Sequence, residues 1–143
     1  MLPRFGHLLV PLDFTAKNQA ALDIAFEIAE VNAARVTLLH VIERIDEAAE
    51  DEETRAFYER LRQRADAELE SRSQRFIEAG LATEYKLRLG KRAEEIVRFV
   101  VERDVDLIVL SSHVIDANQP AKSLASLSYQ VSILAPCPVL LVK

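Results

Sequence analysis

The sequence predicts an α/β fold of the doubly wound class, in which helices cover both faces of a parallel sheet. Short apolar runs such as residues 107–110 are too short for helices and suit strands that are buried on both faces. Segments with helical spacing of apolar residues separate these runs, so that five strands alternate with four helices. The last segment, residues 106–143, has the pattern strand, loop, helix, strand, which is the unit that joins two parallel strands.

The first predicted unit of strand, helix and strand lies within residues 8–42. A buried strand at residues 8–12 ends at Asp13, and Thr15 is expected to cap the helix that follows. A second strand is predicted at residues 35–42. The side chains expected to pack this helix on the sheet recur at helical spacing: Leu22, Ala25, Phe26 and Ala29.

A long amphipathic helix with an acidic start is predicted next. Residues 46–53 include six acidic residues in eight, and negative side chains favour the positive end of a helix dipole. We interpret this run as a solvated face, while an acidic docking surface for a protein partner remains the alternative. Gly80 is expected to end the helix. The apolar stripe of the helix is expected at positions spaced by four: Phe57, Leu61, Ala65 and Leu69.

The second half of the chain supplies the remaining strands. Residues 83–89 alternate strictly between apolar and polar side chains, which predicts an edge strand with one face in water. Gly90 makes a turn into a helix over residues 92–103, and residues 139–142 form the closing strand. Two helices are expected to bury apolar positions: Ile96, Val97, Val100 and Val101 in the first, and Leu124, Leu127, Val131 and Leu134 in the second.

Composition indicates one domain spanning residues 1–143. A chain of 143 residues that is 50% apolar can bury roughly two-thirds of its unfolded surface. The net charge of −5 argues against nucleic-acid or anionic-membrane partners, because binding to phosphates relies on clustered Lys and Arg. The single cysteine, Cys137, excludes an intramolecular disulfide, so a cytoplasmic location is expected. The apolar run near the amino-terminus is too short to span a bilayer.

Four segments resemble successive landmarks of the universal stress protein family. They read VPLDF from residue 10, LHVI from residue 39, DLIVLSSH from residue 106 and APCPVLLV from residue 135. The resemblance implies an adenine nucleotide alpha hydrolase-like fold with a parallel sheet in the order 3-2-1-4-5. It also implies a homodimer through strand 139–142.

The same resemblance implies a nucleotide site. In ATP-binding members an Asp at the end of the first strand contacts the ribose or adenine side, which maps onto Asp13, preceded by Pro11 and Leu12. A backbone position after the second strand meets adenine and maps near Val41. The phosphate loop maps onto the 111–126 loop, with candidate residues Ser111, Ser112, His113, Val114, Ala125 and Ser126.

The phosphate loop is where the sequence departs from the family pattern. Nucleotide-binding members resemble Gly-x-x-Gly, a spacer, then Gly-Ser/Thr, whereas the matching positions here are Ser111, Val114 and Ala125, with only Ser126 kept. A positive φ at Val114 would cost about 1–2 kcal/mol. Asp116 would add a repulsion of about 1 kcal/mol, which Lys122 could partly offset. Together these penalties weaken phosphate binding roughly ten- to hundredfold.

Three functional hypotheses are considered, of which the third, an enzyme that hydrolyses ATP, is the least favoured. The first is a stress-response module, dimeric and regulatory, with a degenerate pocket, weak or no ATP binding and no required cofactor. The second is a binding module that holds ATP or AMP with Mg²⁺ through Asp13, Val41 and the 111–126 loop. An enzyme is not expected, because no catalytic base, nucleophile motif or metal-ligand spacing is found. Asp13 could instead only organise a loop, and Ser126 could only start the last helix.

Overall fold

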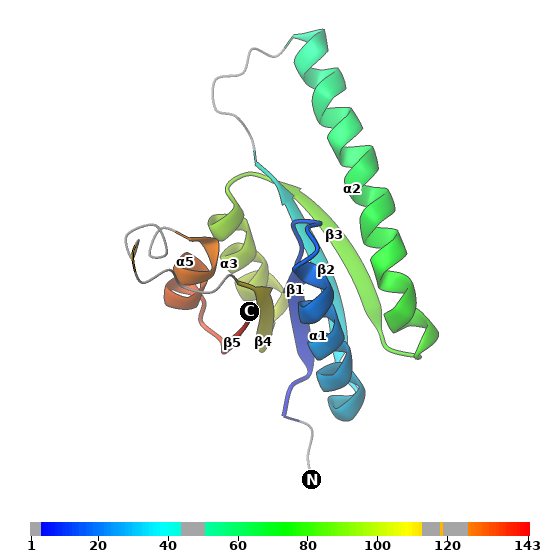
Figure 1. Ribbon diagram of the computed structural model, residues 1–143, viewed down its shortest axis with the longest axis vertical. Coiled ribbons are helices and arrows are strands. Elements are labelled where there is room, and N and C mark those ends of the chain that lie inside the picture. Colours follow the sequence, from blue (N-terminus) through cyan, green and yellow to red (C-terminus); the bar gives the residue numbers. More distant parts are fainter. Residues whose placement is uncertain (1–3, 44–50, 113–117, 119–125) are drawn as a thin grey trace.

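A computed structural model describes residues 4–43, 51–112, 118 and 126–143 of the chain. The strands form one sheet in the order β3-β2-β1-β4-β5, and each neighbouring pair is parallel, so the predicted fold class and strand order are confirmed (Figure 1). Along the chain the elements are β1 (His7–Pro11), α1 (Asn18–Asn32), β2 (Arg35–Ile42), α2 (Glu52–Glu78), β3 (Thr83–Leu89), α3 (Arg92–Arg103), β4 (Leu107–Ser111), α5 (Leu127–Leu134) and β5 (Val139–Val142).

Helices cover both faces of the sheet, and each face has its own apolar core. α1 and α2 pack on one face, where Ala25, Leu69 and Phe76 meet strand residues such as Leu38. α3 and α5 pack on the other face. The central strand β1 is buried along its whole length, because both of its neighbours are strands and both of its faces carry helices.

The strand order reverses beside β1. From β1 the chain passes through α1 to β2 on one side, whereas β4, on the other side of β1, is reached only after β3 and α3. The loops that leave the carboxyl ends of β1 and β4 therefore diverge. Such a topological switch point is where open parallel sheets form a crevice.

The start of α1 differs from the prediction. Thr15 does not cap this helix, because α1 begins at Asn18 and Lys17 is its N-cap residue, without a side-chain cap. The backbone N–H and the hydroxyl of Thr15 instead donate to Oδ1 of Asp13. The two residues thus form a local turn between β1 and α1.

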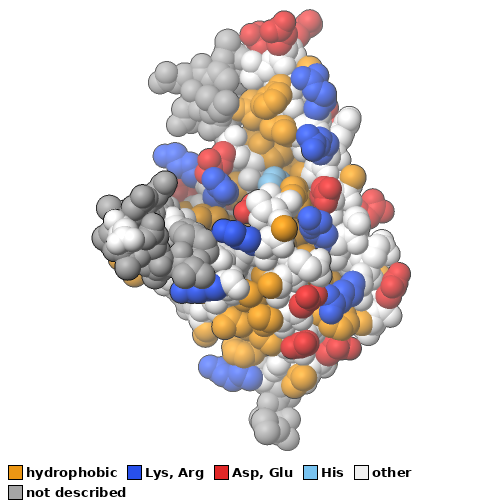
Figure 2. All heavy atoms as spheres, in the orientation of Figure 1, with side chains coloured by type: hydrophobic (Ala, Val, Ile, Leu, Met, Phe, Trp, Pro, Cys, Tyr) orange, Lys and Arg blue, Asp and Glu red, His pale blue; other side chains and the backbone are white. Residues whose placement is uncertain are grey.

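Only the second half of α2 packs on the sheet. Its buried residues begin at Ala65, and Phe57, predicted to lie on the buried stripe, has 45% of its surface exposed. Figure 1 shows the first half of the helix extending beyond the sheet. Acidic side chains gather at this tip in Figure 2, where Glu52 and Glu53 form the first turn and Asp51 caps it through the N–H of Thr54.

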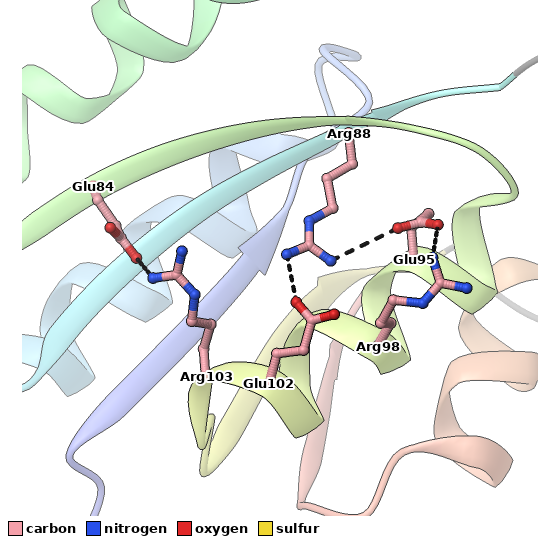
Figure 3. Close-up of polar contacts among 6 residues, drawn as sticks. All are labelled: Glu84, Arg88, Glu95, Arg98, Glu102 and Arg103. Atoms are coloured by element: carbon pink, nitrogen blue, oxygen red, sulfur yellow. Dashed lines mark hydrogen bonds and ion pairs between the residues drawn. The ribbon is translucent and has the colours of Figure 1, made fainter.

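The edge strand β3 is less exposed on its polar face than predicted. Its residues are half-buried except Leu89, which was expected to point inward and is 46% exposed. Charged side chains of α3 reach the polar face, and Figure 3 shows ion pairs joining Arg88 to Glu95 and Glu102. The alternation of apolar and polar residues could not predict this partial burial. It shows which side chains are polar, but not whether they contact water or form ion pairs with a helix.

α3 buries Ile96 and Val100 as predicted, but the rest of its inner face differs from the prediction. Val101 is 64% exposed, and Phe99 takes the inner position. The guanidinium groups of Arg88 and Arg103 lie 5.0 and 5.5 Å from the centre of the Phe99 ring. Arg88 lies on β3 and therefore joins this ring to the sheet, whereas Arg103 contacts the ring from within α3.

Candidate functional site

A pocket lies at the carboxyl ends of β1, β2 and β4, at the switch point of the sheet. Its floor is apolar and its rim carries a small number of polar side chains, an arrangement typical of small-molecule sites. Arg92, at the start of α3, stands on the β2 side, and Ser111 on the β4 side. The lining residues are Pro11, Leu12, Asp13, Asn18, Leu39, Val41, Arg92, Ile96, Leu110, Ser111 and Leu127.

The side chain of Asn18 forms hydrogen bonds with two segments that line the pocket. It is the first residue of α1 and has only 1% of its surface exposed. Its Oδ1 accepts hydrogen bonds from the N–H groups of Asp13 and Phe14, at 3.0 and 2.7 Å. Its Nδ2 donates to Oγ of Ser111 at 3.0 Å. One buried side chain therefore connects the loop after β1 with the end of β4.

Asp13 presents a carboxylate at the rim. Burial alone would raise its pKa, but hydrogen bonds from Thr15 and Asn18 outweigh this effect and hold the pKa below its usual value of 3.8. The carboxyl group is therefore ionised at neutral pH. A fixed negative charge suits hydrogen-bond donors of a ligand, such as hydroxyl groups.

His40 and Phe14 support the loop that carries Asp13. Nδ1 of His40 donates to the carbonyl of Leu12 at 2.7 Å, and its ring stacks on Phe14 with the centroids 4.2 Å apart. Burial lowers the pKa of His40, although the bond to Leu12 and the charge of Asp13 oppose this shift. Phe14 has a φ of 64°, which a non-glycine residue adopts only when its surroundings hold it there.

The structure brings together five of the predicted site residues in this one pocket: Pro11, Leu12, Asp13, Val41 and Ser111. Val41 lies inside β2, as the predicted strand 35–42 implies, and its side chain is buried in the pocket wall. The carbonyl of Ile42, the last residue of β2, accepts a hydrogen bond from the N–H of Gly90 at 3.0 Å.

The other predicted residues lie elsewhere or outside the described part. Ser112 places its Oγ 3.1 Å from Oγ of Ser128. Ser126 is the N-cap of α5 and accepts a bond from the N–H of Tyr129, so it does start the last helix. Outside the described residues lie His113, Val114, Asp116, Lys122, Leu124 and Ala125.

Two polar residues of the pocket, Asn18 and Arg92, are not among the predicted site residues. Asn18 follows Thr15 in a polar stretch that resembles a solvated helix start. Arg92 was assigned only to the first turn of a helix; in the structure its Nε donates to Glu43 at 3.1 Å. The only sequence signal for either residue is its position just after the carboxyl end of a strand, where parallel sheets place their sites.

Other candidate chemistry finds no support within the described ranges. No group of three His, Cys, Asp or Glu side chains among them could hold a metal ion. Burial is the main cause that raises the pKa of the Cys137 thiol, and the charge of Asp106 adds to it. The thiol therefore stays protonated at neutral pH. None of the helices in these ranges combines the length and apolar character needed to cross a membrane.

Comparisons with known proteins all match members of one protein family. The model of the universal stress protein family matches residues 4–143. The universal stress protein YxiE of Bacillus subtilis (strain 168) is 30% identical over 151 aligned residues, which cover 97% of this chain and 99% of YxiE. A family protein from Burkholderia pseudomallei is 25% identical with a TM-score of 0.78, and 96% of each chain is covered.

A further solved structure shares the fold at lower identity. The universal stress protein from Archaeoglobus fulgidus, solved in complex with dAMP, has a TM-score of 0.69 and 18% identity. The comparison covers 97% of this chain and 98% of that protein.

Proposed function

This chain belongs to the universal stress protein family, and we propose that it acts as a dimeric regulatory module whose nucleotide pocket has lost tight phosphate binding. One contrast carries the proposal. The part of the pocket formed by the strand ends has an apolar floor and a polar rim that includes Asp13 and Ser111. The positions that correspond to the family's phosphate glycines carry Ser111, Val114 and Ala125 instead.

The second candidate function is weak binding of an adenine nucleotide. The apolar floor suits a flat base, and the ionised Asp13 suits the hydroxyl groups of a sugar. The dAMP complex of the Archaeoglobus fulgidus protein makes AMP a reasonable ligand to test, with ATP and Mg²⁺ beside it. Both candidates share one pocket and differ in how much the phosphates contribute to affinity.

Turnover of a nucleotide is not part of the proposal. Asp13 is the one carboxylate among the described residues that line the pocket. Its lowered pKa makes it a weak general base, since an efficient base has a pKa near the working pH. We therefore expect binding without hydrolysis.

The dimer that we propose uses the β5 edge. Exposed apolar side chains gather on α5 and β5, and in a monomer they would remain in water: Tyr129, Ile133, Leu134 and Leu140. An apolar patch beside an unpaired strand edge favours pairing with a second copy, which would extend the sheet across a two-fold axis.

The proposal can be tested by restoring glycines and a positive charge in the 111–126 loop. Calorimetry should detect weak or no binding of ATP with Mg²⁺ to the unmodified protein. The triple variant Val114→Gly, Ala125→Gly and Asp116→Lys should raise affinity by about one to two decades, because it removes about 2–3 kcal/mol of strain and repulsion.

Asp13→Ala in the triple-variant background should abolish most of that gain. Micromolar binding of ATP by the unmodified protein would contradict the loss of phosphate binding. A triple variant that stays folded by circular dichroism and binds no better would place the obstruction elsewhere in the pocket.

A further inference from the structure

The first half of α2, residues 52–64, carries an apolar stripe that reaches the surface. Phe57 is 45% exposed, its ring meets that of Tyr58 edge to face with 5.6 Å between the centroids, and Leu61 is half-buried. The stripe continues into the buried side of the helix at Ala65, because residues three or four apart share one face. Figure 2 shows apolar side chains at the surface just below the acidic tip of the molecule.

Charged side chains flank this stripe in a pattern that repeats after three turns. Asp51 and Arg62 are 11 positions apart, and so are Glu53 and Arg64, and all four are exposed. Eleven residues make about three full turns, so each acid lies on the same flank of the stripe as its arginine, about 16–17 Å away. At this separation the acid and the arginine of one chain do not form an ion pair with each other.

The two arginines have no carboxylate partner among the described residues of their own chain. Further along α2, Arg72 pairs with Glu68 at 2.9 Å. Neither Arg62 nor Arg64 forms such a pair with a residue in the described ranges. Their guanidinium groups, like the carboxylates three turns earlier, can therefore pair with charges on a second molecule.

We propose that the first half of α2 binds the same segment of a second copy, in antiparallel orientation about a two-fold axis beside Phe57 and Tyr58. The midpoints of both 11-residue spacings fall within one position of these residues. A single axis therefore places each acid opposite the arginine of the other copy and brings the two apolar stripes face to face. A parallel arrangement would instead oppose like charges.

This contact is separate from the β5 edge and weaker than a standard interface. The β5 edge lies at the opposite end of the sheet from β2 and β3, on which α2 packs. The segment 52–64 spans about 20 Å, which is too short to bury the roughly 1,600 Å² of a stable complex. We expect a dissociation constant of about 100 µM, so that α2 joins copies only at high protein concentration. The pairing does not depend on the nucleotide pocket.

Sedimentation equilibrium of the full chain tests the pairing. The average mass of the unmodified protein should rise at least 1.5-fold between about 10 µM and about 1 mM. Arg64→Glu should weaken this association about tenfold, because it turns two attractive contacts in each pair into repulsive ones. Glu53→Arg should weaken it to the same extent.

An equimolar mixture of these two variants is the decisive sample. A mixed pair regains both attractive contacts, so its dissociation constant should return to within about threefold of that of the unmodified protein. Glu59→Arg is the matched control, since it makes the same change of charge in the same helix. It lies two positions from Phe57 and therefore about 200° around the helix, away from the stripe, so it should leave the association unchanged.

A mass that stays constant up to about 1 mM would overturn the inference. So would folded variants whose mixture associates no better than each variant alone, or a Glu59→Arg protein that is weakened as much as Arg64→Glu. Phe57→Ala keeps the test decisive if circular dichroism shows that a charge variant has lost helix. Removal of this exposed ring should weaken the association about tenfold, and an unchanged dissociation constant would contradict the pairing.

Discussion

At the scale of single residues, we expect His40 to make the stability of the protein depend on pH. Burial lowers its pKa, so the folded protein resists a proton that the unfolded chain accepts near pH 6.5. The free energy of unfolding should therefore be largest above pH 6.5 and fall as the pH drops below that value, until folded His40 itself titrates. One such group contributes a slope of at most about 1.4 kcal/mol per pH unit.

His40→Asn tests this expectation, because its amide can still donate to the carbonyl of Leu12. Urea unfolding of both proteins at a series of pH values should show their stability difference shrinking as the pH falls from neutral to below 6. A difference that stays constant over this range would mean that His40 does not carry the pH dependence.

Residue roles were predictable to different degrees. Asp13 was identified because it directly follows a buried strand and matches a family landmark. Asn18 was not, because a polar residue at a helix start is usually solvated, and only the approach of β4 buries it against Ser111. A contact between residues 93 positions apart leaves no local pattern in a single sequence.

At the scale of elements, β5 offers the sharpest test of assembly. The N–H of Ile108 and of Ser112 donate to the carbonyls of Pro138 and Val142. In a parallel strand alternate residues bond to the same neighbour, so the N–H of Leu141 points away from β4, towards the open edge.

Leu141→Pro therefore deletes an edge donor without removing a bond to β4. If the chain pairs through β5, this variant should be a monomer by light scattering and keep its circular dichroism spectrum. Leu141→Arg should also give a monomer, and because the Leu141 side chain packs against the core, this variant counts only if its circular dichroism spectrum is unchanged. A dimer mass that survives both substitutions would place the interface on another surface.

The two halves of α2 should differ in their contribution to stability. Leu69 is fully buried against the sheet, so Leu69→Ala should lower the free energy of unfolding by about 2–5 kcal/mol. Phe57→Ala, in the half that extends beyond the sheet, should change it by less than about 0.5 kcal/mol. Urea unfolding measures both, and an equal loss for the two variants would show that the first half of α2 is packed in solution.

The extension of α2 illustrates why element packing was only partly predictable. The spacing by four correctly identified Ala65 and Leu69, but the same pattern continues back to Phe57. The 27 residues of α2 span about 40 Å, whereas the seven residues of β3 span about 23 Å, so the helix is too long for the sheet. Periodicity does not say which turns reach the sheet.

At the scale of the whole molecule, the strand order creates the site. The sequence predicted alternating strands and helices, and the family resemblance supplied the order in which the strands lie. That order places the ends of β1, β2 and β4 together, which gathers residues from three separate parts of the chain around one pocket. The central claim is that this pocket retains a nucleoside site without a working phosphate site.

An NMR titration of amide resonances with AMP and with ATP and Mg²⁺ tests this claim most directly. We predict that both ligands shift the same amides, with the largest changes at Asp13, Val41, Arg92 and Ser111. The two apparent affinities should agree within about threefold, since the additional phosphates gain little. Shifts confined to other surfaces, or an ATP affinity one hundred times that for AMP, would contradict it.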